Sequence, residues 1–437
     1  MARSSLYPPS VDPGFPFLQE TPEGWIQTTF GEALEVVERP VALAKNNTYR
    51  LVNAKRNRGG ITLRGTLQGR EILTKTQFEV KAGDFLISRR QIIHGACGVV
   101  PRELDGAIVS NEYSTLKPRA GLLLDFLRHY SNTPYFQRTC FHSSHGVDVE
   151  KMIFKIGEWL VRRVDRPPIG EQRKIAAILS AVDDATEATQ AIIDQLRFVK
   201  KAMMAELLTR GLPGRHTQFK QTEAGEIPHD WRVRPLKEVA RCFNGKAAGT
   251  GGSWLRVFKT KHVYDGMVRL DKIEYARDDS AAKTRVDMYL RDADVLTPNM
   301  AHGTIGRIAF VPMAEDKWTV DGQVMVLRAD RINLLGRFLF ESLSLPRGRQ
   351  RLLDLEKGGA FDTLRGQTHI YPRDVAEIPL ALPPLEEQRS IAAASESFDA
   401  PLETNQQHMA GLRELKQGLM NRLLTGELRV PPDEAAT

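Results

Sequence analysis

The residues in this sequence that could do chemistry are mainly cations and amides on short polar turns. In the first half of the chain, KRNRGG places Lys55, Arg56 and Arg58 on a glycine-flanked turn after a strand-like run. A basic turn of this kind can enter a DNA groove, where its cations neutralise phosphates and arginine can donate two hydrogen bonds to guanine. A solvated charged loop is the alternative interpretation, and the residues alone leave both open.

A second polar group in the first half follows another strand-like run. Its candidates are Arg89, Arg90, Gln91 and His94, which precede the glycines of HGACG. Glutamine can pair with adenine and arginine with guanine, so this group is also a candidate for direct DNA contact. From residue 45 to residue 90 the sequence has 11 Lys or Arg against 3 acidic residues, which favours a polyanionic partner.

The second half of the chain offers eight corresponding candidates for DNA contact: Lys259, Lys261, His262, Asn299, His302, Thr363, Arg365 and Gln367. The first three follow a strand-like run. The next two occupy the places that Arg89 and His94 have in the first half. The last three lie on a polar loop before the second long helix, where a simple connection is the alternative.

Catalytic motifs are missing from the same segments. HGACG (94–98) and HGTIG (302–306) could form oxyanion loops, but no serine or cysteine nucleophile with a base stands beside them, and glycine turns explain both. Cys140 has His142 and His145 nearby but no second ligand cluster. There is no GxxxxGK[ST], HExxH or GxSxG motif, and no Asn- or Asp-Pro-Pro-aromatic element for adenine methylation. We therefore expect no catalytic residue and no metal site in this chain.

The composition bounds the class of protein. The chain has 437 residues, enough for two or three domains, with 41% hydrophobic and 26% charged residues and a net charge of +7. No apolar run approaches the ~20 residues of a membrane span, and MARSSLYPPSVDPGF lacks the apolar core of a signal peptide. The three cysteines stand in no CxxC pair, which indicates reduced thiols. A cytoplasmic protein is expected.

The polar turns must be positioned by a stretch that the chain contains twice. Residues 167–209 and 383–425 align without a gap at a constant offset of 216 (383 − 167), and 18 of the 43 aligned positions are identical. Both copies begin PPxxEQRxIA, with prolines suited to the first helical position and a glutamate in the first turn. Their apolar residues recur in three- and four-residue steps, which predicts two long helices of roughly 60 Å each.

The apolar seams of these helices cannot stay exposed. Packing on each other as an antiparallel coiled coil is the economical solution, with burial in two separate globular cores as the alternative. The second copy carries Pro401 and is polar at Asn405 and His408. A kink or break is expected there.

Each long helix follows a globular segment, and the two segments echo each other. Both open on Pro-x-x-Trp, at Trp25 and Trp231, and Asp84-Phe-Leu-Ile is echoed by Asp294-Val-Leu-Thr. Short strand-like runs predict a mixed, mostly β segment in the first half, with residues 121–130 and 149–164 helical in period. Both tryptophans are interpreted as core anchors rather than as base-stacking platforms.

The predicted fold class is α+β: two mixed α/β domains separated by two long helices that pack as an antiparallel coiled coil, in a pseudo-twofold repeat. The expected boundaries are a flexible N-terminal arm (1–20), a first globular domain (21–166), a first long helix (167–211), a linker (212–227), a second globular domain (228–382), a second long helix (383–428) and a C-terminal tail (429–437). Two alike halves match the symmetry that a duplex presents.

The repeat also resembles a known family. The PPxxEQRxIA helix starts, the PxxW entries and the closing LLTGELRV resemble the specificity subunit of type I restriction-modification systems, over residues 21–430. Within residues 49–113, YRLVNAKRNRGGI, GDFLISR and GVVPRELDGAIVSNEY look like a recurring target-recognition domain of that family.

The resemblance implies that each globular domain is a target-recognition domain that reads one half of a bipartite sequence in double-stranded DNA, while the helices set the unread spacer. Two copies of a DNA adenine methyltransferase (modification) subunit would dock on the helices, and restriction subunits with translocase and nuclease activity would join them. This chain would hold no cofactor, because S-adenosylmethionine, and ATP with Mg, would be bound by the partner subunits.

Other functions remain open on the sequence. A coiled-coil scaffold with protein-binding globular domains is the main alternative. An enzyme that acts alone on DNA and a subunit of a methylation-only system are two others. Salt-dependent DNA binding separates the DNA-recognition subunit from the scaffold.

Overall fold

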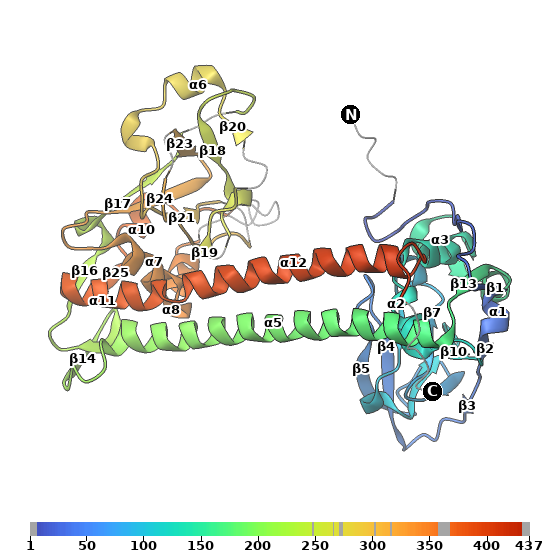
Figure 1. Ribbon diagram of the computed structural model, residues 1–437. Helices are drawn as coiled ribbons and strands as arrows, with labels where there is room; N and C mark the ends of the chain where they lie inside the picture. Colours follow the sequence, from blue (N-terminus) through green and yellow to red (C-terminus); the bar gives the residue numbers. More distant parts are fainter. Residues whose placement is uncertain are drawn as a thin grey trace, which may run out of the picture. The chain divides into compact units, whose positions relative to one another are not determined.

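The computed structural model describes residues 7–246, 249–264, 266–270, 274–300, 303–314, 317–356 and 368–430. The chain divides by its contacts into two units: unit 1 comprises residues 1–190 and 408–437, and unit 2 comprises residues 191–407. Each unit holds one globular segment together with part of each long helix (Figure 1). None of the described helices is both long and apolar enough to cross a membrane.

The first repeat copy forms α5 (Ile169–Arg210), a single helix of 42 residues. The second copy forms two helices, α11 (Leu385–Glu396) and α12 (Asp399–Leu423). The expected break is therefore confirmed, and Pro401 stands in the first turn of α12, where a missing N–H removes no helical hydrogen bond. Pro168 and Pro384 each precede the first helical residue instead of occupying it.

Unit 1 contains two larger sheets with the strand orders β2-β10-β7-β8 and β3-β6-β9-β4-β5. Their strands are β2 (Leu34–Val36), β3 (Pro40–Val41), β4 (Thr48–Ala54), β5 (Ile61–Gln68), β6 (Gln77–Val80), β7 (Phe85–Ser88), β8 (Cys97–Val99), β9 (Ala107–Ser110) and β10 (Tyr113–Pro118). Two short pairs are β1 (Ile26–Thr29) with β13 (Arg163–Arg166) and β11 (Ser144–His145) with β12 (Ile153–Phe154). The helices are α1 (Phe30–Ala33), α2 (Leu124–Tyr130), α3 (Pro134–His142) and α4 (Ile156–Leu160), with 3-10 turns η1 (Ile92–His94), η2 (Arg102–Leu104) and η3 (Val149–Lys151).

The core of unit 1 joins its helices to an aromatic cluster. Phe30 stacks on Trp159 with ring centroids 4.0 Å apart, and the ring of Phe136 makes T-shaped contacts with both. Ile175 of α5 and Met420 of α12 belong to the same buried cluster. Burial of these apolar faces, at about 25 cal/mol per Å², is what fixes the two helices to this domain.

Two segments of unit 1 differ from expectation. Residues 149–164 do not form one helix but η3, β12, α4 and β13 in turn, because β12 and β13 take partners in β11 and β1. Residues 7–20 of the expected flexible arm contact the rest of the unit: Asp12 Oδ2 accepts from Arg138 Nε at 2.9 Å, and the carbonyl of Gly14 lies 3.1 Å from His142 Nε2.

Unit 2 also contains two larger sheets, with the strand orders β17-β24-β21-β22-β19 and β20-β18-β23. Their strands are β17 (Ala240–Asn244), β18 (Arg256–Phe258), β19 (Gly266–Met267), β20 (Glu274–Tyr275), β21 (Val295–Pro298), β22 (Ala309–Phe310), β23 (Trp318–Val320) and β24 (Val324–Ala329). The expected linker carries a hairpin of β14 (Phe219–Thr222) with β15 (Gly225–Pro228), and β16 (Arg232–Pro235) pairs with β25 (Pro379–Leu382). The helices are α6 (Asp278–Ala282), α7 (Gly336–Ser344), α8 (Pro346–Asp354) and α10 (Pro372–Val375), with η4 (Leu236–Glu238), η5 (Thr260–His262) and η6 (Val286–Met288).

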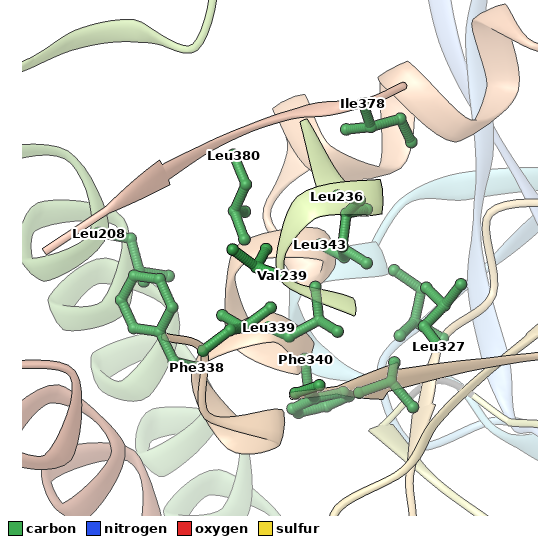
Figure 2. Close-up of a cluster of buried hydrophobic side chains, with 14 of the residues drawn as sticks. Leu208, Leu236, Val239, Leu327, Phe338, Leu339, Phe340, Leu343, Ile378 and Leu380 are labelled. Carbon is green, nitrogen blue, oxygen red and sulfur yellow. The ribbon is translucent and has the colours of Figure 1, made fainter. Parts of the chain in front are cut away.

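The core of unit 2 is built around α7. Figure 2 shows Phe338, Leu339 and Leu343 of this helix among side chains from α5 and from the segments before β17 and around β25. The members that the figure labels are all buried: Leu208, Leu236, Val239, Leu327, Phe338, Leu339, Phe340, Leu343, Ile378 and Leu380. One apolar cluster therefore holds the second domain on the C-terminal part of α5.

The two units share one backbone frame, which consists of a strand pair and a glutamine that bonds to the backbone beside it. In each, the strand after the tryptophan pairs antiparallel with the strand before the Pro-Pro pair, in matching register: Ile26 opposite Arg166, and Arg232 opposite Leu382. Gln172 accepts a hydrogen bond from Leu123 N (2.8 Å) and donates to the carbonyls of Gly121 and Pro167. Gln388 makes the same set with Leu335, Asn333 and Pro383.

A buried carboxylate lies at the centre of each frame. Glu171, 1% exposed, accepts from Trp25 Nε1 (3.1 Å) and from Arg429. Glu387, 0% exposed, accepts from Trp231 Nε1 (3.2 Å) and pairs with His216. The tryptophans are core anchors, as predicted, and their indole N–H groups explain the buried glutamates.

One buried histidine gives unit 1 a pH-dependent stability. His129 of α2 is 1% exposed, and burial lowers its pKa to about 4, with Arg128 adding to the effect and Asp183 opposing it. The unfolded chain takes up its proton first, near pH 6.5, so the free energy of unfolding falls as the pH drops from 6.5 to 4. The expected loss is about 3 kcal/mol. Urea unfolding across this range should show a shallower pH dependence in His129→Gln.

The matched control is His145→Gln, because His145 is exposed and pairs with Glu158 at the surface. That variant makes the same substitution at the surface of the same unit, so the pH dependence of His129→Gln is compared with it. Equal pH dependence in the His129→Gln variant and the wild type would contradict the assignment of this effect to His129.

Candidate nucleic-acid interface

The first predicted group lies on the turn between β4 and β5. Lys55, Arg56 and Arg58 are all exposed there. The turn is closed by a hydrogen bond from Lys55 N to the carbonyl of Gly60 (2.9 Å). Asn57 and Arg58 adopt φ values of 57° and 60°, a left-handed conformation that residues with a Cβ rarely take. The surrounding structure must therefore hold this turn in place.

The second predicted group supplies that support. Asn57 N donates to the carbonyl of His94 (2.7 Å), and Arg58 N donates to the carbonyl of Gly95 (3.2 Å). Arg56 Nε donates to Gln91 Oε1 at 2.6 Å. The fold thus brings the turn after β4 and the η1 segment into one polar cluster.

His94 is the buried member of this cluster. It is 1% exposed, its Nδ1 lies 2.8 Å from Ser10 Oγ, and its Nε2 lies 3.3 Å from Glu150 Oε1. Burial lowers the pKa of its imidazole, and the nearby Arg56 guanidinium lowers it further. A neutral, buried ring can position the turn but presents little surface to a ligand.

Arg89 and Arg90 diverge after β7. Arg90 is exposed and forms a two-point ion pair with Glu112, with Nε 2.5 Å from Oε2 and Nη2 3.1 Å from Oε1. Hydrogen bonding to Glu112 raises the pKa of the Arg90 guanidinium. Arg89 is half-buried, and its Nη1 donates to the carbonyl of Asn111 (3.3 Å).

In unit 2, Lys259 and Lys261 converge on Glu274 of β20. Lys259 Nζ lies 2.5 Å from Glu274 Oε2, and Lys261 contacts the other carboxylate oxygen. Hydrogen bonds from Lys259 and then Lys261 lower the pKa of Glu274 to about 2. His262 is buried, and its Nδ1 accepts from Lys259 N (2.9 Å), which fixes the start of η5.

Asn299 directly follows β21, as Arg89 directly follows β7, so the predicted equivalence of their positions is confirmed. Asn299 is 4% exposed, and its Nδ2 donates to the carbonyl of Gly322 (2.9 Å). Its own carbonyl accepts from Ile370 N. Four further candidates lie outside the described residues: His302, Thr363, Arg365 and Gln367.

Unit 2 also holds a cation–aromatic cluster that the sequence pattern did not indicate. The guanidinium of Arg269 lies 3.3 Å from the ring centroid of Tyr264, and that of Arg307 lies 5.9 Å from it. Tyr264 is 39% exposed, so the ring and the exposed Arg269 are available to a partner. Arg307 lies far from Tyr264 in the sequence, and no spacing rule could have joined them.

The cysteines offer no reactive site. Burial raises the pKa of Cys97 and of Cys242 to about 12, and it raises that of Cys140 well above the usual range. A thiol that resists ionisation is a poor nucleophile. Among the described residues, no three His, Cys, Asp or Glu side chains are grouped so as to hold a metal ion.

Comparison with known proteins finds similarity to specificity subunits of type I restriction enzymes. No protein-family model matches the chain. It is 29% identical over 278 residues to the type I restriction enzyme MjaVIII specificity subunit of Methanocaldococcus jannaschii, covering 61% of this chain and 62% of that protein. It is 26% identical over 315 residues to the putative type I restriction enzyme MjaX specificity subunit of the same organism, covering 70% of this chain and 68% of that protein. The alignment thus spans less than two thirds of the MjaVIII subunit.

Solved structures show the same fold over nearly the whole chain. A chain of a type I R-M system assembly matches with a TM-score of 0.54 at 17% identity, covering 94% of this chain and all of that one. The type I restriction-modification S subunit from M. genitalium matches with a TM-score of 0.56 at 12% identity, covering 93% and 97%. The resemblance stated from the sequence is confirmed by these comparisons.

Proposed function

From the premise that this chain resembles type I specificity subunits in sequence and in fold, we propose that it is the DNA sequence-recognition subunit of a type I restriction-modification complex. It acts in the cytoplasm and carries no catalytic site. The domains at residues 21–166 and 228–382 are target-recognition domains, and each reads one half of a bipartite target. Chemistry on the DNA belongs to partner subunits.

The observation that carries this proposal is the repetition of one frame with different loops. Both units share the strand pairing, the buried glutamine and the tryptophan–glutamate contact. The polar residues mounted on the frames differ, with an arginine-rich turn in unit 1 and a lysine pair in unit 2. Two like scaffolds with unlike contact residues are what a target with two different halves requires.

We also propose that α5 packs antiparallel to α11 and α12 and so sets the spacer between the half-sites. In unit 2, Lys200 Nζ lies 2.9 Å from Asp399 Oδ1. In unit 1, Lys416 Nζ lies 2.5 Å from Asp183 Oδ1. The repeat offset relates the two lysines (416 − 200) and the two aspartates (399 − 183), so the pairs are reciprocal. Reciprocal contacts are the mark of a twofold interface between two like elements.

The candidate residues take two roles in this proposal. The exposed cations Lys55, Arg56, Arg58, Arg90 and Lys261 contact phosphates and base edges. The buried His94, His262 and Asn299 hold the backbone from which such side chains extend. His302, Thr363, Arg365 and Gln367 remain predictions.

The proposed partners follow from the resemblance. Two copies of a DNA adenine methyltransferase subunit dock on the long helices and bring S-adenosylmethionine. Restriction subunits, where the system has them, add ATP-driven translocation and cleavage with Mg. This chain selects the site on double-stranded DNA.

The test is to co-express the chain with the adenine methyltransferase subunit of its own system and to map methylated adenines across the host genome. The expected result is a split motif with a constant unread gap. Replacing residues 45–90 by the corresponding segment of another specificity subunit should change one half of the motif and leave the other half and the gap intact. A stable complex that methylates no defined motif would contradict the proposal and favour the protein-binding scaffold.

A further inference from the structure

Four cations of the candidate interface have a feature that the proposed function does not explain. Each is held by a carboxylate: Arg56 by Glu150, Arg90 by Glu112, and Lys259 and Lys261 by Glu274. Arg56 is held at two points, with Nη2 2.6 Å from Oε2 and Nη1 3.3 Å from Oε1 of Glu150. A surface that only attracts DNA would not need a carboxylate beside each of these cations.

These carboxylates are brought in by the fold. Glu150 is 94 residues from Arg56 in the sequence, on η3, and Glu112 is 22 residues from Arg90. In unit 2, Glu274 lies on a strand and reaches both lysines, which flank the start of η5. Two domains with different loops thus arrive at the same arrangement.

The two pairs in unit 1 are exposed and therefore exchangeable, whereas Glu274 in unit 2 is only partly exposed. The Arg56 and Glu150 side chains are 46% and 51% exposed. Exposed ion pairs contribute only about 0–1 kcal/mol to stability, so DNA can displace them. While they persist, each carboxylate cancels the field of its cation at distances near the ~8–10 Å screening length of salt solution. A phosphate that is not in direct contact is then attracted only weakly.

We propose, on the basis of the proposed DNA-recognition function, that Glu112, Glu150 and Glu274 are specificity-determining residues that withhold these cations from non-target DNA. A correct base edge places a guanine acceptor against the cation and offers a cytosine amino group to the carboxylate, so both partners stay satisfied. On a sequence that places no base amino group opposite the carboxylate, the carboxylate faces the DNA without a donor, and the like charges repel. Discrimination thus rests on a repulsive element as well as an attractive one.

The ionisation of the carboxylates supports this assignment. Hydrogen bonding from Arg56 lowers the pKa of Glu150, and Lys259 with Lys261 lowers that of Glu274. Both groups therefore carry a full negative charge at neutral pH. A glutamine in the same place keeps the shape but removes the charge.

The test measures binding of the chain, in complex with its methyltransferase partner, to three duplexes over a range of salt concentrations. One duplex carries the methylation-mapped target, and the other two carry a scrambled first or second half-site. Glu150→Gln should raise affinity for one of the scrambled duplexes about tenfold, with a salt slope steeper by about 0.9, and change target affinity much less. Glu274→Gln should do the same for the other scrambled duplex.

The matched control is Glu103→Gln, which makes the same charge change in unit 1 at an exposed carboxylate on η2. The inference is wrong if Glu150→Gln and Glu112→Gln change the ratio of target affinity to scrambled-duplex affinity no more than Glu103→Gln does. A wild-type complex that binds all three duplexes equally would instead contradict the proposed function, and the inference would fall with it. Because Glu150 is exposed, its replacement should not unfold the domain, and thermal unfolding of each variant checks this.

Discussion

Replacement of Glu387 by alanine should lower the free energy of unfolding of unit 2 by about 3–5 kcal/mol, the usual result of breaking a buried charge network. Its carboxylate is 0% exposed and accepts from Trp231 Nε1 (3.2 Å), Leu212 N (3.1 Å) and His216 Nε2 (2.8 Å). Alanine leaves the buried indole N–H of Trp231 without a partner and removes the acceptor of Leu212 N and His216 Nε2. Chemical denaturation followed by tryptophan fluorescence measures the change.

The matched control is Glu386→Ala, which removes an exposed carboxylate from the same first turn of α11. Its effect should stay below about 1 kcal/mol, because it loses only a favourable interaction with the helix dipole. Equal stability of the two variants would mean that Glu387 acts only on the helix dipole. Its buried hydrogen bonds would then not stabilise unit 2.

The second large effect concerns DNA. Replacing Lys55, Arg56 and Arg58 together by glutamine should weaken binding of the mapped target by about 100-fold or more, since each contact contributes about 1–3 kcal/mol. The salt dependence should also become shallower, by about 0.9 in log–log slope for each phosphate that is no longer neutralised. Glutamine is preferred to alanine because it removes the charge and keeps most of the side-chain length. Fluorescence anisotropy at several salt concentrations measures both quantities.

A charge-preserving variant separates the two kinds of contact. Arg56→Lys with Arg58→Lys keeps both positive charges but loses the planar two-point fork of arginine. It should retain the salt slope and lose preference for the target at one or two base pairs. Unchanged target affinity in the glutamine triple variant would exclude this turn from the DNA interface.

Elements that repeat or follow a strong period were the most predictable. The constant offset of 216 located both long helices, and Pro401 marked the break that separates α11 from α12. The segment at residues 149–164 was misread as one helix. Its apolar spacing fits a helix, but Phe154 and Trp159 are drawn into the aromatic core, and β12 and β13 find strand partners. Tertiary pairing overrode the local period there.

The sequence singled out candidate residues one by one but could not indicate how the fold arranges them. The sequence singled out Arg56 and Gln91, and the fold joins them by a hydrogen bond of 2.6 Å. It could not reveal that His94 is buried or that Glu150 reaches Arg56, because contacts across 94 residues leave no local pattern. The first-turn glutamates were assigned to the helix dipole, and their bonds to the tryptophans appear only when the strands are in place.

The composition of unit 1 has a consequence for how the chain is made. Its residues 1–190 leave the ribosome about 220 residues before residues 408–430 (408 − 190), an interval of roughly 10–40 s at about 5–20 residues per second. Unit 2 is contiguous and needs no later segment. During that interval Ile175 and Leu179 lack the cover of Met420 and Leu423, and Glu171 lacks Arg429. We therefore expect the nascent chain to expose an apolar strip of α5 until α12 has been translated, and unit 2 to have all of its segments before unit 1 does.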